Sequence, residues 1–402
     1  MSLLIKRSEA APLAAVDLWV ATGTSHEEDS EVGISHFREH LFFKGTPTRP
    51  VGVMDREVKT MGGYNNAATS YDFTHYYIVL PADHVELAME VLVDALLNMA
   101  LPPEEIERER QVVLEEISRK DDSPHGKLYD DFLSVAFEGT PYSRPILGTP
   151  ESLQVIGRDQ FNDYRHRRYS PENIHLAVCG QVDPEAVLSK AERLFEPLPK
   201  NGSNGISAHS FHPKPKTSEF EIKKDVQQTY LCWGVPTHSI QGTEDEIALD
   251  ILSTVLGDGR SSRLVSRLVE STGLCSGVSA FVWVLSGVGL FAVEASYDGG
   301  DEKAVLDIIS EEFDRIRQEP VPEKEFEKAR SMLLAQNAYG LERLSSKAGV
   351  LARSSAFDLL DLVVAYPERI RSCTPSQALE AIQRCCPRDR EVRGFVRPEN
   401  RS

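Results

Sequence analysis

Long apolar runs are missing from this sequence. No stretch reaches the ~20 consecutive apolar residues that a membrane-spanning helix needs. The first 13 residues also lack the basic start, apolar core and small-residue cleavage site of a signal peptide. We therefore expect no membrane association and a cytoplasmic protein, with the periplasm as the alternative if a signal peptide has been removed.

Positive charge is also in short supply. The chain has 44 Lys and Arg against 62 Asp and Glu, which gives a formal net charge of −18. Such a surface repels phosphate backbones and argues against nucleic acid as a partner. The six cysteines form no C-x-x-C pair, and the adjacent Cys385 and Cys386 are not typical of a zinc site. In a chain of this length they are expected to be buried, reduced thiols.

Length and composition indicate a globular protein of two domains. The chain has 402 residues, of which 41% are hydrophobic and 26% charged, enough for two cores at ~100–200 residues per domain. A change of composition near residue 200, to Pro, Gly, Ser, Asn and Lys, is typical of a linker. We place the domains at 1–205 and 217–402, with 206–216 as the linker.

The second half repeats the first in outline, which indicates two similar domains. In each half, runs of β-branched and aromatic residues alternate with amphipathic segments of helical period. The expected strands are 14–23, 74–80, 173–180, 228–235, 279–285 and 289–295, and the expected helices are 32–44, 83–99, 184–195, 244–256, 301–316 and 323–339.

The most informative stretch is His36-Phe37-Arg38-Glu39-His40. Two histidines four residues apart lie on one face of a helix and can bind one Zn²⁺ from consecutive turns. Glu39 precedes His40 directly, and a carboxylate that is not itself a ligand can act as a general base toward water. The order H-x-x-E-H is the inverse of the common zinc-protease signature. Two incidental histidines on a helix are the alternative.

A catalytic zinc usually takes three protein ligands, so a third is needed. A helix is expected from about residue 102, where prolines and glutamates mark its first turn. On it Glu109 and Glu116 share one face with two valines. For the other glutamates of this helix, an ordinary solvated surface is the better interpretation.

At this point the residues resemble a known family. The segment 33–46 (GISHFREHLFFKGT) resembles the signature of the M16 (pitrilysin/insulinase) zinc metallopeptidases. The resemblance makes His36, His40 and Glu116 the zinc ligands, with 75 residues between His40 and Glu116. It makes Glu39 the catalytic base and Glu109 a second glutamate that supports catalysis.

The segment 62–72 (GGYNNAATSYD) is also similar to this family. There it leads into an edge strand that pairs with extended substrate, which makes Asn66 and Ala67 the expected substrate-binding residues. The resemblance implies an α+β fold of two homologous MPP/LuxS-like domains, each an antiparallel-rich sheet covered by helices. It also implies an endopeptidase that cleaves peptides or unfolded segments inside a clamshell chamber.

One family feature is missing from the second half. Family members carry an Arg…Tyr pair seven residues apart, in a later domain or in a partner subunit. Alignment on 261–264 (SSRL) and on the Gly-Leu at 273–274 puts Val269 and Ser276 at those positions. The chain thus resembles the zinc-binding subunits of two-chain members of the family. We expect a heterodimer with an Arg/Tyr-bearing subunit, with a homodimer as the alternative.

Two functions compete with peptide hydrolysis. The first is a catalytically silent scaffold subunit, of a kind that typically loses the zinc residues; here His36, Glu39, His40 and Glu116 are all present. The second is a zinc-stabilised protein that binds peptides without cleaving them, which the missing Arg…Tyr pair leaves open for the isolated chain.

Overall fold

A computed structural model describes residues 1–198, 216–298 and 300–399 of the chain. Of the predicted linker 206–216, every residue but Lys216 lies outside this described part. The described residues form two compact units, and neither is continuous in sequence. No helix in the described part is both long and apolar enough to cross a membrane.

The first unit is built on a five-stranded sheet in the order β1-β5-β2-β4-β3. Only β1 and β5 pair in parallel, and all other neighbours are antiparallel. Strand β3 forms one edge of the sheet. The strands are β1 (Ser2–Arg7), β2 (Leu13–Val20), β3 (Tyr64–Thr69), β4 (Thr74–Pro81) and β5 (Ile174–Gly180).

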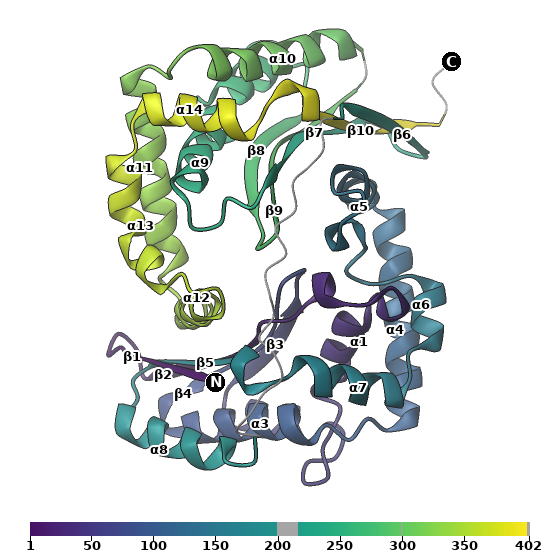
Figure 1. Ribbon diagram of the computed structural model, residues 1–402, viewed down its shortest axis with the longest axis vertical. Helices are drawn as coiled ribbons and strands as arrows, with labels where there is room; N and C mark the ends of the chain where they lie inside the picture. Colours follow the sequence, from purple (N-terminus) through teal and green to yellow (C-terminus); the bar gives the residue numbers. More distant parts are fainter. Residues whose placement is uncertain (199–215, 299, 400–402) are drawn as a thin grey trace. The chain divides into compact units, whose positions relative to one another are not determined.

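Helices cover one face of this sheet and enclose the main core of the unit (Figure 1). Val16 and Leu18 of β2 are fully buried in this core, as are Phe37 of α1 and Leu92 of α3. The helices are α1 (Ile34–Leu41), α2 (Val53–Thr60), α3 (Val85–Asn98), α4 (Pro103–Asp122), α6 (Pro150–Val155), α7 (Arg158–Arg168) and α8 (Pro184–Phe195).

The second unit repeats this topology with the strand order β6-β10-β7-β9-β8, and here β6 and β10 are the parallel pair. Its strands are β6 (Ser218–Lys224), β7 (Thr229–His238), β8 (Gly277–Val284), β9 (Val288–Tyr297) and β10 (Val392–Pro398). Its helices include α9 (Glu244–Gly257), α10 (Glu302–Gln318), α11 (Glu323–Gly340), α13 (Leu360–Ser372) and α14 (Pro375–Cys385).

Each sheet receives one helix from the other half of the chain. Helix α12 (Leu344–Ala356) packs on β2 and β5 of the first unit, on the face away from the main core. Helix α5 (Pro124–Ala136) packs on β7 and β10 of the second unit. Strand β2 shows why the sheet needs this additional helix. Seven consecutive residues of β2 are buried, and a strand with apolar residues on both faces must be covered on both.

The expected α+β fold of two similar, mostly antiparallel sheets covered by helices is confirmed. The helix expected over 32–44 is shorter than predicted. It runs from Ile34 to Leu41, because Gly33 adopts a φ of +93° that ends regular geometry on its N-terminal side. The contiguous domain limits 1–205 and 217–402 stay a prediction, and the exchange of α5 and α12 was not foreseen.

Candidate metal centre

A buried carboxylate fixes where the histidine-bearing helix α1 begins. The Glu27 side chain accepts hydrogen bonds from the backbone N–H groups of Gly33, at 2.7 Å, and Ser35, at 2.8 Å. These are donors that the first turn of a helix cannot satisfy internally. Burial raises the pKa of Glu27 to about 7, although these hydrogen bonds act in the opposite direction. The start of α1, and with it the position of His36, is therefore held from outside the helix.

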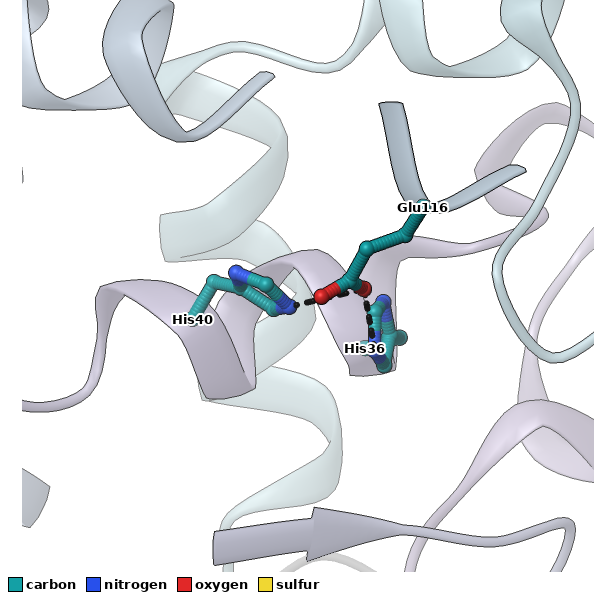
Figure 2. Close-up of side chains that lie close together, drawn as sticks. All are labelled: His36, His40 and Glu116. Atoms are coloured by element: carbon teal, nitrogen blue, oxygen red, sulfur yellow. Dashed lines mark ion pairs between the residues drawn. The ribbon is translucent and has the colours of Figure 1, made fainter. Parts of the chain in front are cut away.

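Two histidines and one glutamate converge between α1 and α4 (Figure 2). The Glu116 Oε2 atom lies 3.6 Å from His36 Nε2 and 3.4 Å from His40 Nε2. Both distances exceed the 2.7–3.2 Å of an ordinary N–H···O hydrogen bond. Ligand atoms bound tetrahedrally to one zinc at ~2.0–2.1 Å lie ~3.4 Å apart. The three residues therefore fit a zinc ion.

A second carboxylate on α4 orients His40. Glu109 Oε2 lies 3.2 Å from His40 Nδ1, and Glu109 Oε1 lies 2.6 Å from Lys44 Nζ. A carboxylate on Nδ1 stabilises the tautomer that leaves the Nε2 lone pair free for a metal. Glu109 is thus in contact with a candidate ligand rather than being a ligand itself, and Lys44 balances its charge.

Glu39 lies on α1 directly before His40, and its carboxylate is largely removed from solvent. Burial raises the pKa of Glu39, and a hydrogen bond from the Thr69 hydroxyl to Glu39 Oε2, at 3.0 Å, opposes that shift. A carboxylate with a raised pKa next to a metal site is suited to accept a proton and to return it at neutral pH.

The edge strand β3 carries both expected substrate-binding residues. Asn66 is exposed and Ala67 is half-buried against the main core of the first unit. Among the described residues β3 pairs only with β4, so its other edge presents backbone N–H and C=O groups without strand partners. An extended peptide can add to such an edge. Substrate binding by Asn66 and Ala67 remains a prediction.

A second His/Asp/Cys group occurs in the second unit and does not fit a resident metal. His238, Asp245 and Cys385 have potential ligand atoms within 4.8 Å of one another. However, Asp245 already forms an ion pair with Arg384. The pKa of the Cys385 thiol is raised to about 12, first by burial and then by Asp245, which disfavours the thiolate that binds metals.

The positions aligned with the family's Arg…Tyr pair offer no comparable donors. Val269 lies in a π-helical turn (Val265–Ser271) and is half-buried against the hydrophobic core of the second unit. The Ser276 hydroxyl donates to the Ser296 carbonyl at 3.2 Å. The nearby Arg267 forms ion pairs, both at 2.7 Å, with Glu311 and Glu312.

Sequence reasoning missed three residues around the site: Glu27, Lys44 and Thr69. Lys44 follows His40 by four residues, a helical spacing that would have placed both on one side. Thr69 alternates with Ala67 along β3 and therefore lies on the same face. No sequence pattern indicated Glu27, because its hydrogen bonds to α1 depend on the turn that lies between Glu27 and the helix.

Two helix-borne histidines, a glutamate from a second helix and a largely desolvated carboxylate beside them are the residue types that a zinc peptidase site requires. Comparison with known families agrees. Residues 2–150 match the family described as "Insulinase (Peptidase family M16)", and residues 156–333 match "Peptidase M16 inactive domain". The chain belongs to peptidase family M16.

The relatives come from several bacteria. An uncharacterized zinc protease of Mycobacterium leprae is 33% identical over 85% of this chain and 77% of its own length. One of Rickettsia bellii is 30% identical over 85% of this chain and 82% of its own length. The crystal structure of a protease from Helicobacter pylori has a TM-score of 0.89 at 25% identity, covering 98% of this chain and 96% of that one.

Proposed function

We propose that this chain is a zinc-dependent endopeptidase that hydrolyses peptides or unfolded polypeptide segments, and that it acts as the catalytic subunit of a two-chain enzyme. The observation that carries the proposal is the convergence of His36, His40 and Glu116 at zinc-compatible distances, with Glu39 beside them. The zinc-protease names of the relatives support the same chemistry.

His36, His40 and Glu116 would hold the zinc, and Glu109 would keep His40 in the required tautomer. When bound, zinc supplies Lewis-acid polarisation to the scissile carbonyl and to the attacking water. Glu39 takes one proton from that water as its oxygen bonds to the carbonyl carbon. Glu39 then gives the proton to the amide nitrogen as the C–N bond breaks. The carboxylate is thereby restored for the next turnover.

The free edge of β3 is the proposed binding site for the substrate backbone. Main-chain hydrogen bonds to this edge would hold a peptide extended, whatever its sequence, which favours unfolded segments over folded proteins. Asn66 and Ala67 lie on this strand, three and two residues, respectively, before Thr69, which contacts Glu39. Backbone recognition and hydrolysis would then take place at neighbouring positions.

The test is Glu39→Gln. The amide is nearly isosteric and Glu39 is not a proposed ligand, so the variant should keep its zinc and lose peptide hydrolysis. Zinc is measured by atomic absorption and cleavage with a quenched fluorescent peptide, with and without an Arg/Tyr-bearing partner chain. Near-normal hydrolysis by the variant would remove Glu39 from the mechanism.

The same experiment separates the competing functions. A protein that holds no zinc and cleaves nothing with any partner would be a scaffold subunit. A protein that holds zinc and binds peptides without turnover under all conditions would be a peptide-binding subunit.

A further inference from the structure

The carboxylate of Glu39 is held by a single side chain of the edge strand. The hydroxyl of Thr69, the last residue of β3, donates to Glu39 Oε2 at 3.0 Å. The residues that the structure describes offer this carboxylate no second side-chain hydrogen bond. Thr69 contacts Oε2, so Oε1 is the oxygen of Glu39 to which the described residues offer no side-chain donor.

The position of Thr69 is fixed by the backbone. The tip of the β3–β4 hairpin is bonded to the segment that leads into α1: Ser25 N–H donates to the Tyr71 carbonyl at 2.8 Å, and the Ser25 hydroxyl donates to Asp72 Oδ1 at 3.0 Å. At Gly23 an added Cβ would lie 2.1 Å from the Ser70 carbonyl oxygen, so only glycine permits this approach. These contacts tie the tip of the hairpin, next to Thr69, to the segment that leads into α1.

The same strand presents the edge to which we propose that substrate adds. Thr69 shares its face of β3 with Ala67, and both are half-buried. A peptide paired with the main chain of β3 would hold this strand more firmly than the hairpin alone. Binding of the backbone and orientation of the base would then depend on one element.

We infer that Thr69 is the positioning residue of Glu39, and that the edge strand thereby couples the binding of extended substrate to the alignment of the general base. The inference rests on the proposed function. Thr69 itself takes no proton and forms no bond to substrate; it acts by holding one oxygen of Glu39.

The test compares Thr69→Val, which is isosteric but lacks the hydroxyl, with Thr69→Ser, which keeps it. We expect Thr69→Val to lower kcat about ten- to a hundredfold, as misplacement of a catalytic group does, with KM and zinc content close to those of the wild type. Thr69→Ser should restore most of kcat. Crystal structures of the zinc-loaded proteins should show the Glu39 carboxylate displaced in Thr69→Val and retained in Thr69→Ser.

Thr74→Val is the matched control. Thr74 pairs directly with Thr69 across the hairpin, but its hydroxyl donates to the Thr22 carbonyl, at 3.1 Å, and not to Glu39. Its loss should lower the unfolding midpoint while leaving kcat within about twofold, because no group of the site is touched.

Each outcome decides between the proposals. If the wild type cleaves peptides and Thr69→Val has the same kcat, the inference is wrong while the proposed function stands. If Thr69→Val loses zinc, or Thr69→Ser fails to restore kcat, the role of Thr69 is structural. If the wild type cleaves nothing, even with an Arg/Tyr-bearing partner chain, the proposed function fails, and the orientation of Glu39 in the crystal structures still decides whether Thr69 positions it.

Discussion

At the residue scale, adjacent glutamates of α4 have different environments. Glu116 lies against both histidines, whereas Glu115 is exposed, since one residue is a turn of about 100° around a helix. The position of a glutamate around the helix, rather than its residue type, decides whether it takes part in the site.

We predict that Glu116→Gln lowers zinc affinity far more than Glu115→Gln. Loss of one of three protein ligands should reduce affinity by at least about a hundredfold, more than loss of an outer-shell partner. Competition with a chelating dye measures both variants, and Glu115→Gln should match the wild type. Zinc loss in Glu115→Gln instead would mean that the third ligand is assigned one residue away from its true place.

Glu27 predicts a pH dependence of stability. Its pKa is raised by burial from 4.5 to about 7, so the folded state binds the proton more tightly than the unfolded state. The stabilisation is complete below about pH 4.5 and is lost as the pH rises through about 7, on the order of 3 kcal/mol in total.

Glu27→Gln should remove this part of the pH dependence. Urea unfolding of wild type and variant from pH 4.5 to 7.5, with a chelator present so that zinc does not contribute, gives the comparison. The wild type should lose stability relative to the variant as the pH rises. Parallel curves would show that Glu27 titrates alike in both states.

At the element scale, helix α12 packs closely against the sheet of the first unit. Ala348 and Ala352 of α12 are fully buried against the first sheet. An added Cβ at Gly349 would lie 3.3 Å from Asp17 Oδ2. Small residues let this helix approach the sheet, so larger or charged ones at these positions should disrupt the packing.

Ala352→Asp should therefore lower the free energy of unfolding by at least about 3 kcal/mol, since it buries an unpaired charge. Arg353→Asp is the control, because Arg353 is the next residue of the same helix and is exposed. It should change stability by less than about 1 kcal/mol. Equal effects of the two substitutions would contradict the packing of α12 on the sheet.

At the scale of the whole molecule, the two units share a topology, but among the described residues only the first has a cluster that fits a resident metal. The described part of the second unit has no counterpart of the group formed by His36, His40 and Glu116. In its cluster of His238, Asp245 and Cys385, the Asp245 carboxylate already forms an ion pair with Arg384. The shared topology of the two units therefore does not bring the residues of the candidate metal centre with it.

We predict that the chain alone binds zinc and cleaves peptides slowly, and that a partner carrying the Arg…Tyr pair raises the rate by about two to three orders of magnitude. Val269 has no side-chain donor and the Ser276 hydroxyl already donates to the Ser296 carbonyl, whereas one preorganised oxyanion donor is worth roughly 3–4 kcal/mol. Steady-state cleavage of a quenched peptide, titrated with the partner, measures the effect. Full activity without partner, from a homodimer or a monomer, would overturn the two-chain proposal.

The sequence by itself determined the parts that depend on local spacing. The separation of His36 and His40 follows from the helical period, the face shared by Glu109 and Glu116 follows from the same period, and the alternation of β3 follows from strand geometry. The repeat of strands and helices indicated two similar domains, and the strand order of both sheets agrees with this.

Only the tertiary structure decided which distant groups meet. Three contacts depend on turns whose directions a local pattern does not encode. They are the contact of Thr69 with Glu39, the ion pair of Lys44 with Glu109 and the hydrogen bonds of Glu27 at the start of α1. The exchange of α5 and α12 was hidden for the same reason. Each helix has an apolar face, but the hydrophobic pattern of its sequence does not say which sheet that face packs on. The hydrophobic effect is non-directional, so either sheet would bury the same apolar area.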